Sequence, residues 1–165
     1  MTSIEGADAR PPLVFRPARV DEKASLEALQ WRASINNPGD REAILSHPDA
    51  IEIPIDQLAG GLVFVAESAG AIVGFAAILP RADGDADLDA LFVEPQLWRK
   101  GYGRALIAHC VDAARERHAL ALHVIGNPHA EAFYLSCGFE LGGIEQMRFG
   151  PGLLMPKSIS PAPEG

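Results

Sequence analysis

The fold is decided by residues 87–106, which read Asp-Leu-Asp-Ala-Leu-Phe-Val-Glu-Pro-Gln-Leu-Trp-Arg-Lys-Gly-Tyr-Gly-Arg-Ala-Leu. An alternating, strand-forming run ends at Val93, because Pro95 cannot donate to a strand ladder. A short polar turn leads to Gly101-Tyr102-Gly103, and a helical pattern follows. Strand, glycine turn and helix start is an arrangement that binds phosphate, since the first N–H groups of a helix lack partners and the helix dipole favours an anion.

Three cations, Arg99, Lys100 and Arg104, lie at this corner of a chain whose formal net charge is −8. Two nucleotide-binding patterns do not fit. The Walker pattern needs a Gly-Lys-Ser/Thr end, which is absent, and the dinucleotide fingerprint needs a small residue where Leu106 stands. On the glycines alone, a basic surface turn before an ordinary helix remains an alternative.

A second block, residues 127–139, reads Asn-Pro-His-Ala-Glu-Ala-Phe-Tyr-Leu-Ser-Cys-Gly-Phe. In this order and spacing, the two blocks resemble the GCN5-related N-acetyltransferase (GNAT) superfamily. The first resembles its acyl-CoA pyrophosphate loop, Gln/Arg-x-x-Gly-x-Gly/Ala, and the second its Asn-x-x-Ala-x-x-Phe/Leu-Tyr-x-x-x-Gly-Phe segment. One departure is Trp98 at the Gln/Arg position, with the cation one residue later at Arg99. Because backbone donors do most of the phosphate binding, we expect the loop to keep its role.

The resemblance implies an α/β fold of the mixed-sheet (α+β) type. Its central sheet has six or seven mostly antiparallel strands, splays between strands four and five, and is flanked by about four helices. The hydrophobic patterns agree with this arrangement. Strands are predicted at residues 13–16, 62–67, 71–79, 85–93 and 120–125, and helices at residues 22–35, 40–46, 101–117 and 127–137. The crossover helix predicts that strands four and five are parallel.

The chain has room for one hydrophobic core. We predict a flexible arm at residues 1–12, a single GNAT domain at residues 13–157 and a disordered tail at residues 158–165. Residues 47–60 contain prolines and glycines and are predicted as an irregular loop on the substrate side. Gly74 is predicted to mark a bulge, Asp40 to cap the second helix, and Phe139 to begin a strand. The last strand is left open between residues 146–149 and 153–157.

The resemblance also implies roles for particular residues. The residues implied to bind the CoA arm and diphosphate are Leu91, Phe92, Val93, Arg99, Lys100, Gly101, Tyr102, Gly103, Arg104 and Asn127. Tyr134 occupies the position of the tyrosine that protonates the leaving sulfur; its ordinary pKa near 10 suits a general acid. Without the motif, a half-buried helix tyrosine is the simpler interpretation. The general base is left open among three strand carboxylates, Asp89, Asp87 and Glu67.

Composition limits the other classes of function. The chain has 48% hydrophobic residues but no apolar run long enough for a membrane helix, and its polar start predicts a cytoplasmic protein. The negative charge disfavours nucleic-acid binding. No metal is predicted: residues 83–94 superficially resemble a calcium loop, but Leu88 stands where such a loop needs glycine. Cys110 and Cys137 are predicted to be reduced thiols.

The resemblance to the GNAT superfamily implies the function, transfer of acetyl from acetyl-CoA to a primary amine by direct attack in a ternary complex, and the phosphate-binding pattern of the glycine turn agrees with it. The acceptor is a small molecule or a peptide; polyamines, aminoglycosides, amino acids and protein N-termini all stay open, because acceptor specificity resides in loops. The alternative is a catalytically inactive acyl-CoA-binding sensor or regulatory module. A homodimer is a further hypothesis by analogy.

Overall fold

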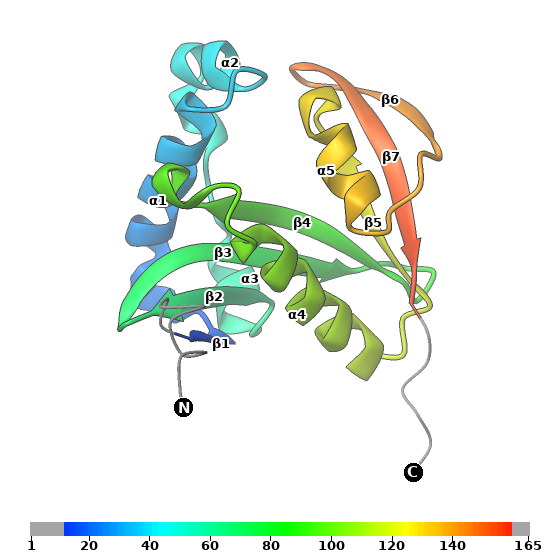
Figure 1. The fold of residues 1–165 in the computed structure, drawn as a ribbon, viewed down its shortest axis with the longest axis horizontal. Helices are drawn as coiled ribbons and strands as arrows, with labels where there is room; N and C mark the ends of the chain where they lie inside the picture. The colour runs from blue at the N-terminus through cyan, green and yellow to red at the C-terminus, as the bar shows by residue number, and fades with distance from the viewer. Residues whose placement is uncertain (1–11, 160–165) are drawn as a thin grey trace, which may run out of the picture.

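One mixed sheet of seven strands organises the structure, a computed structural model that describes residues 12–159 (Figure 1). The strand order is β1-β2-β3-β4-β5-β7-β6, and every neighbouring pair is antiparallel except β4 and β5, as predicted. The strands are β1 Leu13–Pro17, β2 Val63–Ser68, β3 Ala71–Pro80, β4 Ala86–Val93, β5 Ala121–Gly126, β6 Gly143–Met147 and β7 Gly150–Ser158. The helices are α1 Lys23–Ile35, α2 Arg41–Ser46, α3 Ile55–Ala59, α4 Tyr102–Glu116 and α5 Glu131–Ser136, with short 3-10 turns η2 Val20–Glu22, η3 Pro48–Ala50, η4 Pro95–Leu97 and η5 Pro128–Ala130.

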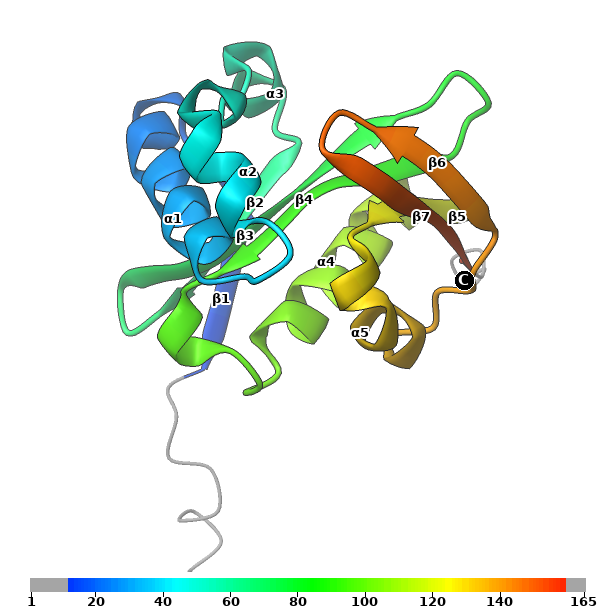
Figure 2. The ribbon, with the colours of Figure 1, turned by 90° about the horizontal axis from the view of Figure 1, so that it is seen from above.

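Both faces of the central strands are buried, which explains their continuous apolar sequences. Along β2, Val63 and Val65 pack on the side of α1 and α3, whereas Phe64 and Ala66 pack into the larger core beneath α4. Figure 2 shows α1, α2 and α3 on one side of the sheet and α4 and α5 on the other. The two layers hold β4 between them, so residues from either side can meet at its end.

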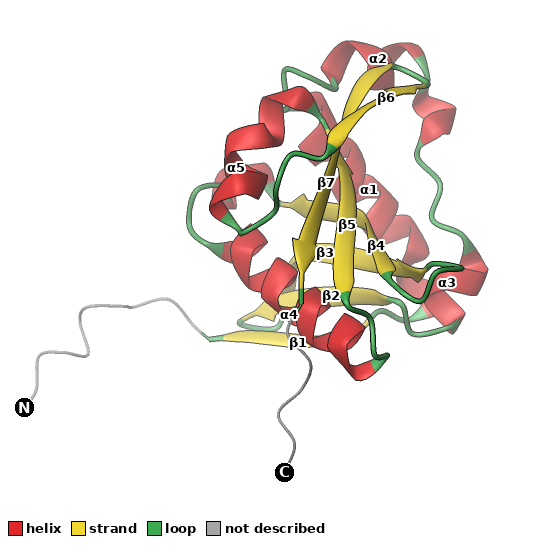
Figure 3. Ribbon diagram, turned by 90° about the vertical axis from the view of Figure 1, so that its right-hand side faces the viewer, coloured by secondary structure: helices red, strands yellow, loops and turns green. Residues whose placement is uncertain are grey.

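The sheet splits between β4 and β5. Their parallel pairing is confined to Ala86 with Leu122 and Asp87 with His123, although β4 continues to Val93 and β5 to Gly126. In Figure 3, β5 and β7 run across the direction of β1 to β4. The splay predicted between these strands is therefore present. The second half of β4 pairs with β3 along one edge and has no partner strand along the other.

The bulge predicted at Gly74 is present in β3. Ala66 of β2 pairs with Gly74 and the next residue pairs with Ile72, so one residue of β3 is skipped. A Cβ at Gly74 would lie 2.9 Å from the carbonyl oxygen of Phe92. Glycine at this position therefore lets β3 approach the strand that forms the site.

Several boundaries differ from the sequence-based expectations. Phe139 does not begin a strand: it is a core residue, and the following segment donates two hydrogen bonds to β7 before β6 starts at Gly143. The candidate at residues 153–157 lies within β7, whereas the candidate at residues 146–149 spans the end of β6 and the turn of the β6–β7 hairpin. Residues 47–60 are not wholly irregular, since they contain η3 and α3.

The predicted tail begins inside the sheet. Ser158 ends β7 and Ile159 is buried, while the rest of that tail and residues 1–11 of the predicted arm lie outside the described residues. Within residues 12–159, no helix combines the length and the apolar character needed to cross a membrane.

Candidate active site

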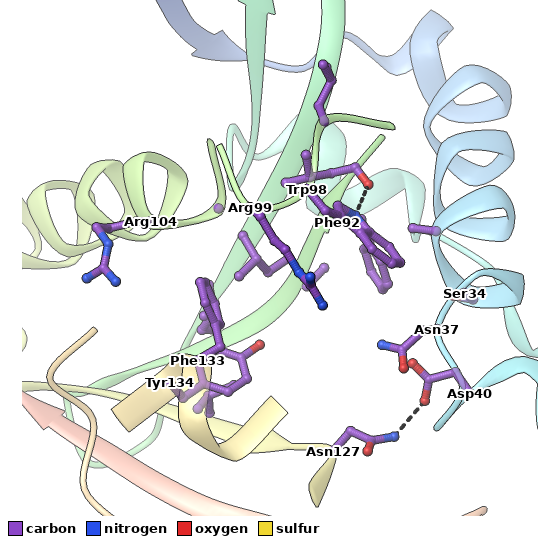
Figure 4. Close-up of a pocket in the computed structure, with 18 of the residues that line it drawn as sticks. Ser34, Asn37, Asp40, Phe92, Trp98, Arg99, Arg104, Asn127, Phe133 and Tyr134 are labelled. Carbon is purple, nitrogen blue, oxygen red and sulfur yellow. Dashed lines mark hydrogen bonds between the residues drawn. The ribbon is translucent and has the colours of Figure 1, made fainter. Parts of the chain in front are cut away.

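A cavity of about 690 Å³ lies where β4 and β5 separate. Its walls come from four parts of the chain: the end of α1 and the loop after it, the second half of β4, the turn leading into α4, and the β5–α5 segment (Figure 4). The lining residues are Ala33, Ser34, Asn37, Asp40, Leu88, Asp89, Ala90, Leu91, Phe92, Val93, Leu97, Trp98, Arg99, Gly101, Gly103, Arg104, Val124, Ile125, Asn127, Phe133 and Tyr134. The glycine corner, the splayed strand and Tyr134 thus share one space.

The glycine corner forms the N-terminus of α4. Gly101 is the N-cap residue, has φ of 90° and ψ of 1°, and offers no side chain to the first amides of the helix. A Cβ there would meet nothing within 4 Å, so the left-handed backbone, rather than space, favours glycine. Arg99 also has a positive φ, of 66°. Such a turn at a helix start directs N–H groups outward to an anion.

The cations of this corner have different surroundings. The Arg99 side chain reaches into the cavity between Tyr134 and the α1 side (Figure 4). Arg104 donates from its two terminal nitrogens to the carbonyl and hydroxyl oxygens of Ser136, both at 2.9 Å, and so ties α4 to α5. Lys100 is exposed and does not line the cavity. Arg99 and Arg104 therefore both bring positive charge to the cavity wall.

Trp98 holds the turn against β4. Its indole Nε1 donates to the carbonyl oxygen of Val93 at 2.8 Å, and its ring lies beside Phe92 in the cavity wall (Figure 4). An ion pair joins α1 to the residue that follows β4: the Nη2 atom of Arg32 lies 2.6 Å from Glu94 Oε2. The residue that departs from the family pattern thus fixes the end of β4 to the turn.

The ring of Tyr134 packs against other aromatic side chains, whereas its hydroxyl group is open to the cavity. Ring centroids of Phe133 and Phe139 lie 5.2 and 5.5 Å from its own, in edge-to-face geometry. On β5, a Cβ at Gly126 would lie 3.2 Å from the Tyr134 ring. The hydroxyl points into the cavity (Figure 4) and makes no hydrogen bond with any residue in the range 12–159. Burial raises the pKa of Tyr134 to about 12, with smaller contributions from Cys137 and Asp40, so the phenol stays protonated near neutral pH.

Asn127 connects β5 to the loop after α1. Its Oδ1 accepts from the backbone N–H of His129 at 2.8 Å, and its Nδ2 donates to Asp40 Oδ1 at 2.8 Å. Asp40 does occupy the N-cap position of α2, as predicted, but its carboxylate bonds to Asn127 instead of the helix amides. Desolvation raises the pKa of Asp40, partly offset by Asn127 and His129. A half-buried carboxylate therefore lies in the cavity wall.

The structure gathers most of the predicted site residues but not all of them. Tyr102 is buried in the core rather than in the cavity wall. Asp89 is the one predicted base that lines the cavity; its Oδ2 accepts from Gln57 Nε2 at 3.3 Å. Asp87 and Glu67 lie outside the cavity, where they pair with Arg81 and Arg16, respectively, at 3.0 Å each.

Sequence reasoning gave no site role to Ser34, Asn37, Asp40 or Phe133, all of which line the cavity. Phe133 lies inside the second motif, next to Tyr134. The other three belong to the end of α1 and the turn after it. The family resemblance implies that the segment between the first two helices forms part of the acceptor wall, but the Asn-Pro-Gly run there singled out none of these residues. Among residues 12–159, no three His, Cys, Asp or Glu side chains are grouped to hold a metal ion.

Comparison with known families shows which family the chain belongs to. A sequence model of the acetyltransferase (GNAT) family matches residues 25–139, most of the chain. The chain belongs to the GNAT acetyltransferase family. It is therefore an acyltransferase that depends on acetyl-CoA, and the cavity is the candidate active site of that GNAT domain. Among curated proteins, no sequence match is found.

Solved structures share the GNAT fold. PaiA N-acetyltransferase from Thermoplasma acidophilum, in complex with coenzyme A, gives a TM-score of 0.72 at 15% identity, covering 89% of this chain and 99% of that one. A GCN5-related N-acetyltransferase from Rhodopseudomonas palustris gives 0.73 at 24% identity, covering 93% and 100%. The ribosomal-protein-S18-alanine N-acetyltransferase from Escherichia coli gives 0.66 at 23% identity, covering 93% and 97%. At these identities the likeness establishes the fold.

Proposed function

We propose that this protein transfers the acetyl group of acetyl-CoA to a primary amine by direct attack in a ternary complex, with Tyr134 as the general acid. The observation that carries the proposal is the Tyr134 hydroxyl. It opens into the cavity without a partner among the described residues, and the same cavity is bounded by the N-terminus of α4 and the splayed half of β4. Acyl donor, acid and acceptor can therefore occupy one space.

The donor is assigned to the α4 side of the cavity. The diphosphate of acetyl-CoA would lie on the backbone amides around Gly101 and Gly103, aided by Arg99. The pantetheine arm would follow residues 91–93, where β4 lacks a partner strand and offers backbone groups. The Asn127 side chain has only part of its hydrogen-bonding capacity left for this arm, because both its Oδ1 and its Nδ2 already make hydrogen bonds.

Chemistry would proceed at the thioester carbon. The amine attacks the carbonyl, a C–N bond forms and the C–S bond breaks as the thiolate departs. Tyr134 donates a proton to the sulfur, and its aromatic neighbours hold the ring in place for that transfer. The raised pKa of Tyr134 keeps the donor protonated throughout the neutral range.

The acceptor class is a small-molecule or peptide amine. The fold alone does not select between them, because similar structures include enzymes named for ribosomal protein S18 alanine and for nourseothricin. An amine panel should therefore contain both peptides and small amines. The cytoplasmic location and the homodimer stay predictions, and light scattering in solution tests the homodimer.

Tyr134→Phe tests the proposal. Loss of the hydroxyl should lower the turnover number roughly ten-fold or more, measured as thiol release with an amine that the wild type accepts. The affinity for CoA, measured by calorimetry, should barely change, because the ring and its packing are kept. Phe133→Leu, which removes an aromatic neighbour but leaves the hydroxyl, is the comparison for packing effects and should cost less.

An unchanged turnover number in Tyr134→Phe would remove Tyr134 from the mechanism. CoA binding without thiol release, for every amine of the panel, would instead favour an acyl-CoA sensor.

A further inference from the structure

A carboxylate faces the cavity from the side opposite the acid. Figure 4 shows Asp40 and Asn37 on the α1 side and Tyr134 on the α5 side. Asp40 reaches this position because the turn after α1 lies directly against β5: a Cβ on Gly39 would come within 2.8 Å of both terminal atoms of the Asn127 side chain. Asp40 is thus positioned by packing as well as by its hydrogen bond.

The Asp40 carboxylate has no cationic partner within the described residues. The amide of Asn127 occupies one oxygen at 2.8 Å, and no side chain in residues 12–159 forms an ion pair with it. Several other carboxylates of the fold are paired with arginines. Glu94 binds Arg32 and Asp87 binds Arg81 outside the cavity. An unpaired anion in a partly desolvated wall is a complement for a cation, and amine acceptors arrive at neutral pH as ammonium ions.

We propose that Asp40 is the catalytic base: it binds the acceptor's ammonium group and takes its proton, while Asn127 positions the carboxylate. The proposal rests on the acetyl transfer described above and adds the residue that prepares the nucleophile. Asp40 is favoured over Asp89, which is exposed on β4 and shares its carboxylate with Gln57. Asp40 is also close enough to Tyr134 for its charge to influence that phenol.

The proton balance closes with these two groups. One ammonium N–H bond breaks and an O–H bond forms on Asp40, which leaves a neutral amine with a lone pair. After attack, Tyr134 gives its proton to the departing sulfur, and the second proton lost by the nitrogen restores the phenol directly or through water. The proton on Asp40 then passes to solvent. One acetyl amide, one thiol and one free proton result.

Burial suits Asp40 for this role. Desolvation raises its pKa, which makes the carboxylate a stronger proton acceptor than an exposed aspartate. The titratable and charged groups that line the cavity around it or lie beside it are His129 of η5, Tyr134 of α5, Asp89 of β4, Arg99 of the turn and Arg104 of α4. Of these groups, His129 opposes the rise in the pKa of Asp40.

Asp40→Asn tests the assignment, because it keeps the shape and removes the charge. With an amine accepted by the wild type, kcat/KM near neutral pH should fall about 100-fold. The deficit should shrink as pH rises toward the pKa of the amine, because a larger fraction of the acceptor then arrives already neutral. Asp40→Glu, which keeps a carboxylate, should recover part of the rate. Affinity for CoA should be unchanged in both variants.

Glu42→Gln is the matched control, since Glu42 is an exposed acid one half-turn along and does not line the cavity. It should behave as the wild type. Full activity of Asp40→Asn at neutral pH would overturn the proposal, as would a deficit of equal size at every pH, which would indicate a structural role. Absence of thiol release by the wild type with every amine would instead overturn the acetyl transfer itself.

Discussion

Glu22 anchors the start of α1, and removing its carboxylate should weaken the fold by an amount that depends on pH. This side chain is 7% exposed, accepts from the Nη1 and Nη2 atoms of Arg16 at 3.0 and 2.8 Å, and accepts from the backbone N–H of Arg19 at 2.8 Å. Arg16 also binds Glu67, so the network links β1, β2 and η2. Hydrogen bonding to Arg16 lowers the pKa of Glu22 from its ordinary 4.5 to about 2, against the opposing effect of burial.

The shift sets a size and a pH window for its effect on stability. Because the pKa is depressed in the folded state, the ionised form stabilises the fold above pH 4.5, and that stabilisation is lost as pH falls toward 2. At about 1.4 kcal/mol per pH unit, the full effect is about 3 kcal/mol, of which about 2 kcal/mol should be lost by pH 3. In Glu22→Gln this part of the pH dependence should be absent.

Urea unfolding at pH 6 and at pH 3 measures the effect. The difference in unfolding free energy between wild type and Glu22→Gln should be larger at pH 6 than at pH 3 by roughly 2 kcal/mol. Asp21→Asn, at a neighbouring acid whose side chain is 76% exposed, should change little at either pH. An equal difference at both pH values would refute the reasoning about Glu22.

The remaining predictions concern the site. Gly126→Val places side-chain atoms where the Tyr134 ring packs, since even a Cβ would lie 3.2 Å from that ring. Thiol-release assays should show a lower turnover number with CoA binding retained. An unchanged turnover number would mean that the ring position is unimportant. Trp98→Phe keeps an aromatic side chain in the cavity wall but loses the hydrogen bond to the Val93 carbonyl oxygen. Urea unfolding should show a free energy of unfolding lower by about 1 kcal/mol. An unchanged free energy of unfolding would show that solvent replaces the hydrogen bond.

Local sequence predicted the strand, glycine turn and helix that border the cavity on its α4 side. The helix was predicted from Gly101 and starts at Tyr102, and the structure adds the positive φ at Gly101. Tyr134 was singled out by the family motif, since the local sequence alone favoured a half-buried helix tyrosine. The splay was predicted from the family resemblance. In the structure, the pairing between β4 and β5 stops after Asp87.

The individual residues of the acceptor side could not be predicted, although the family resemblance implied a wall between the first two helices, because their positions depend on distant contacts. Asp40 and Asn127 are 87 residues apart, and only the folded chain brings the turn after α1 against the end of β5. The same limit applies to the carboxylates. In the sequence, Glu67 resembles Asp89 as a strand acid, and its pairing with Arg16 becomes visible only in the sheet.

The central claim is that backbone amides at the N-terminus of α4, around Gly101 and Gly103, hold the diphosphate of CoA. Calorimetric titration with CoA and with pantetheine, which lacks the diphosphate, tests it most directly. We predict clear binding of CoA and at least about ten-fold weaker binding of pantetheine. No heat with CoA even at millimolar excess, or equal affinity for the two ligands, would contradict the account.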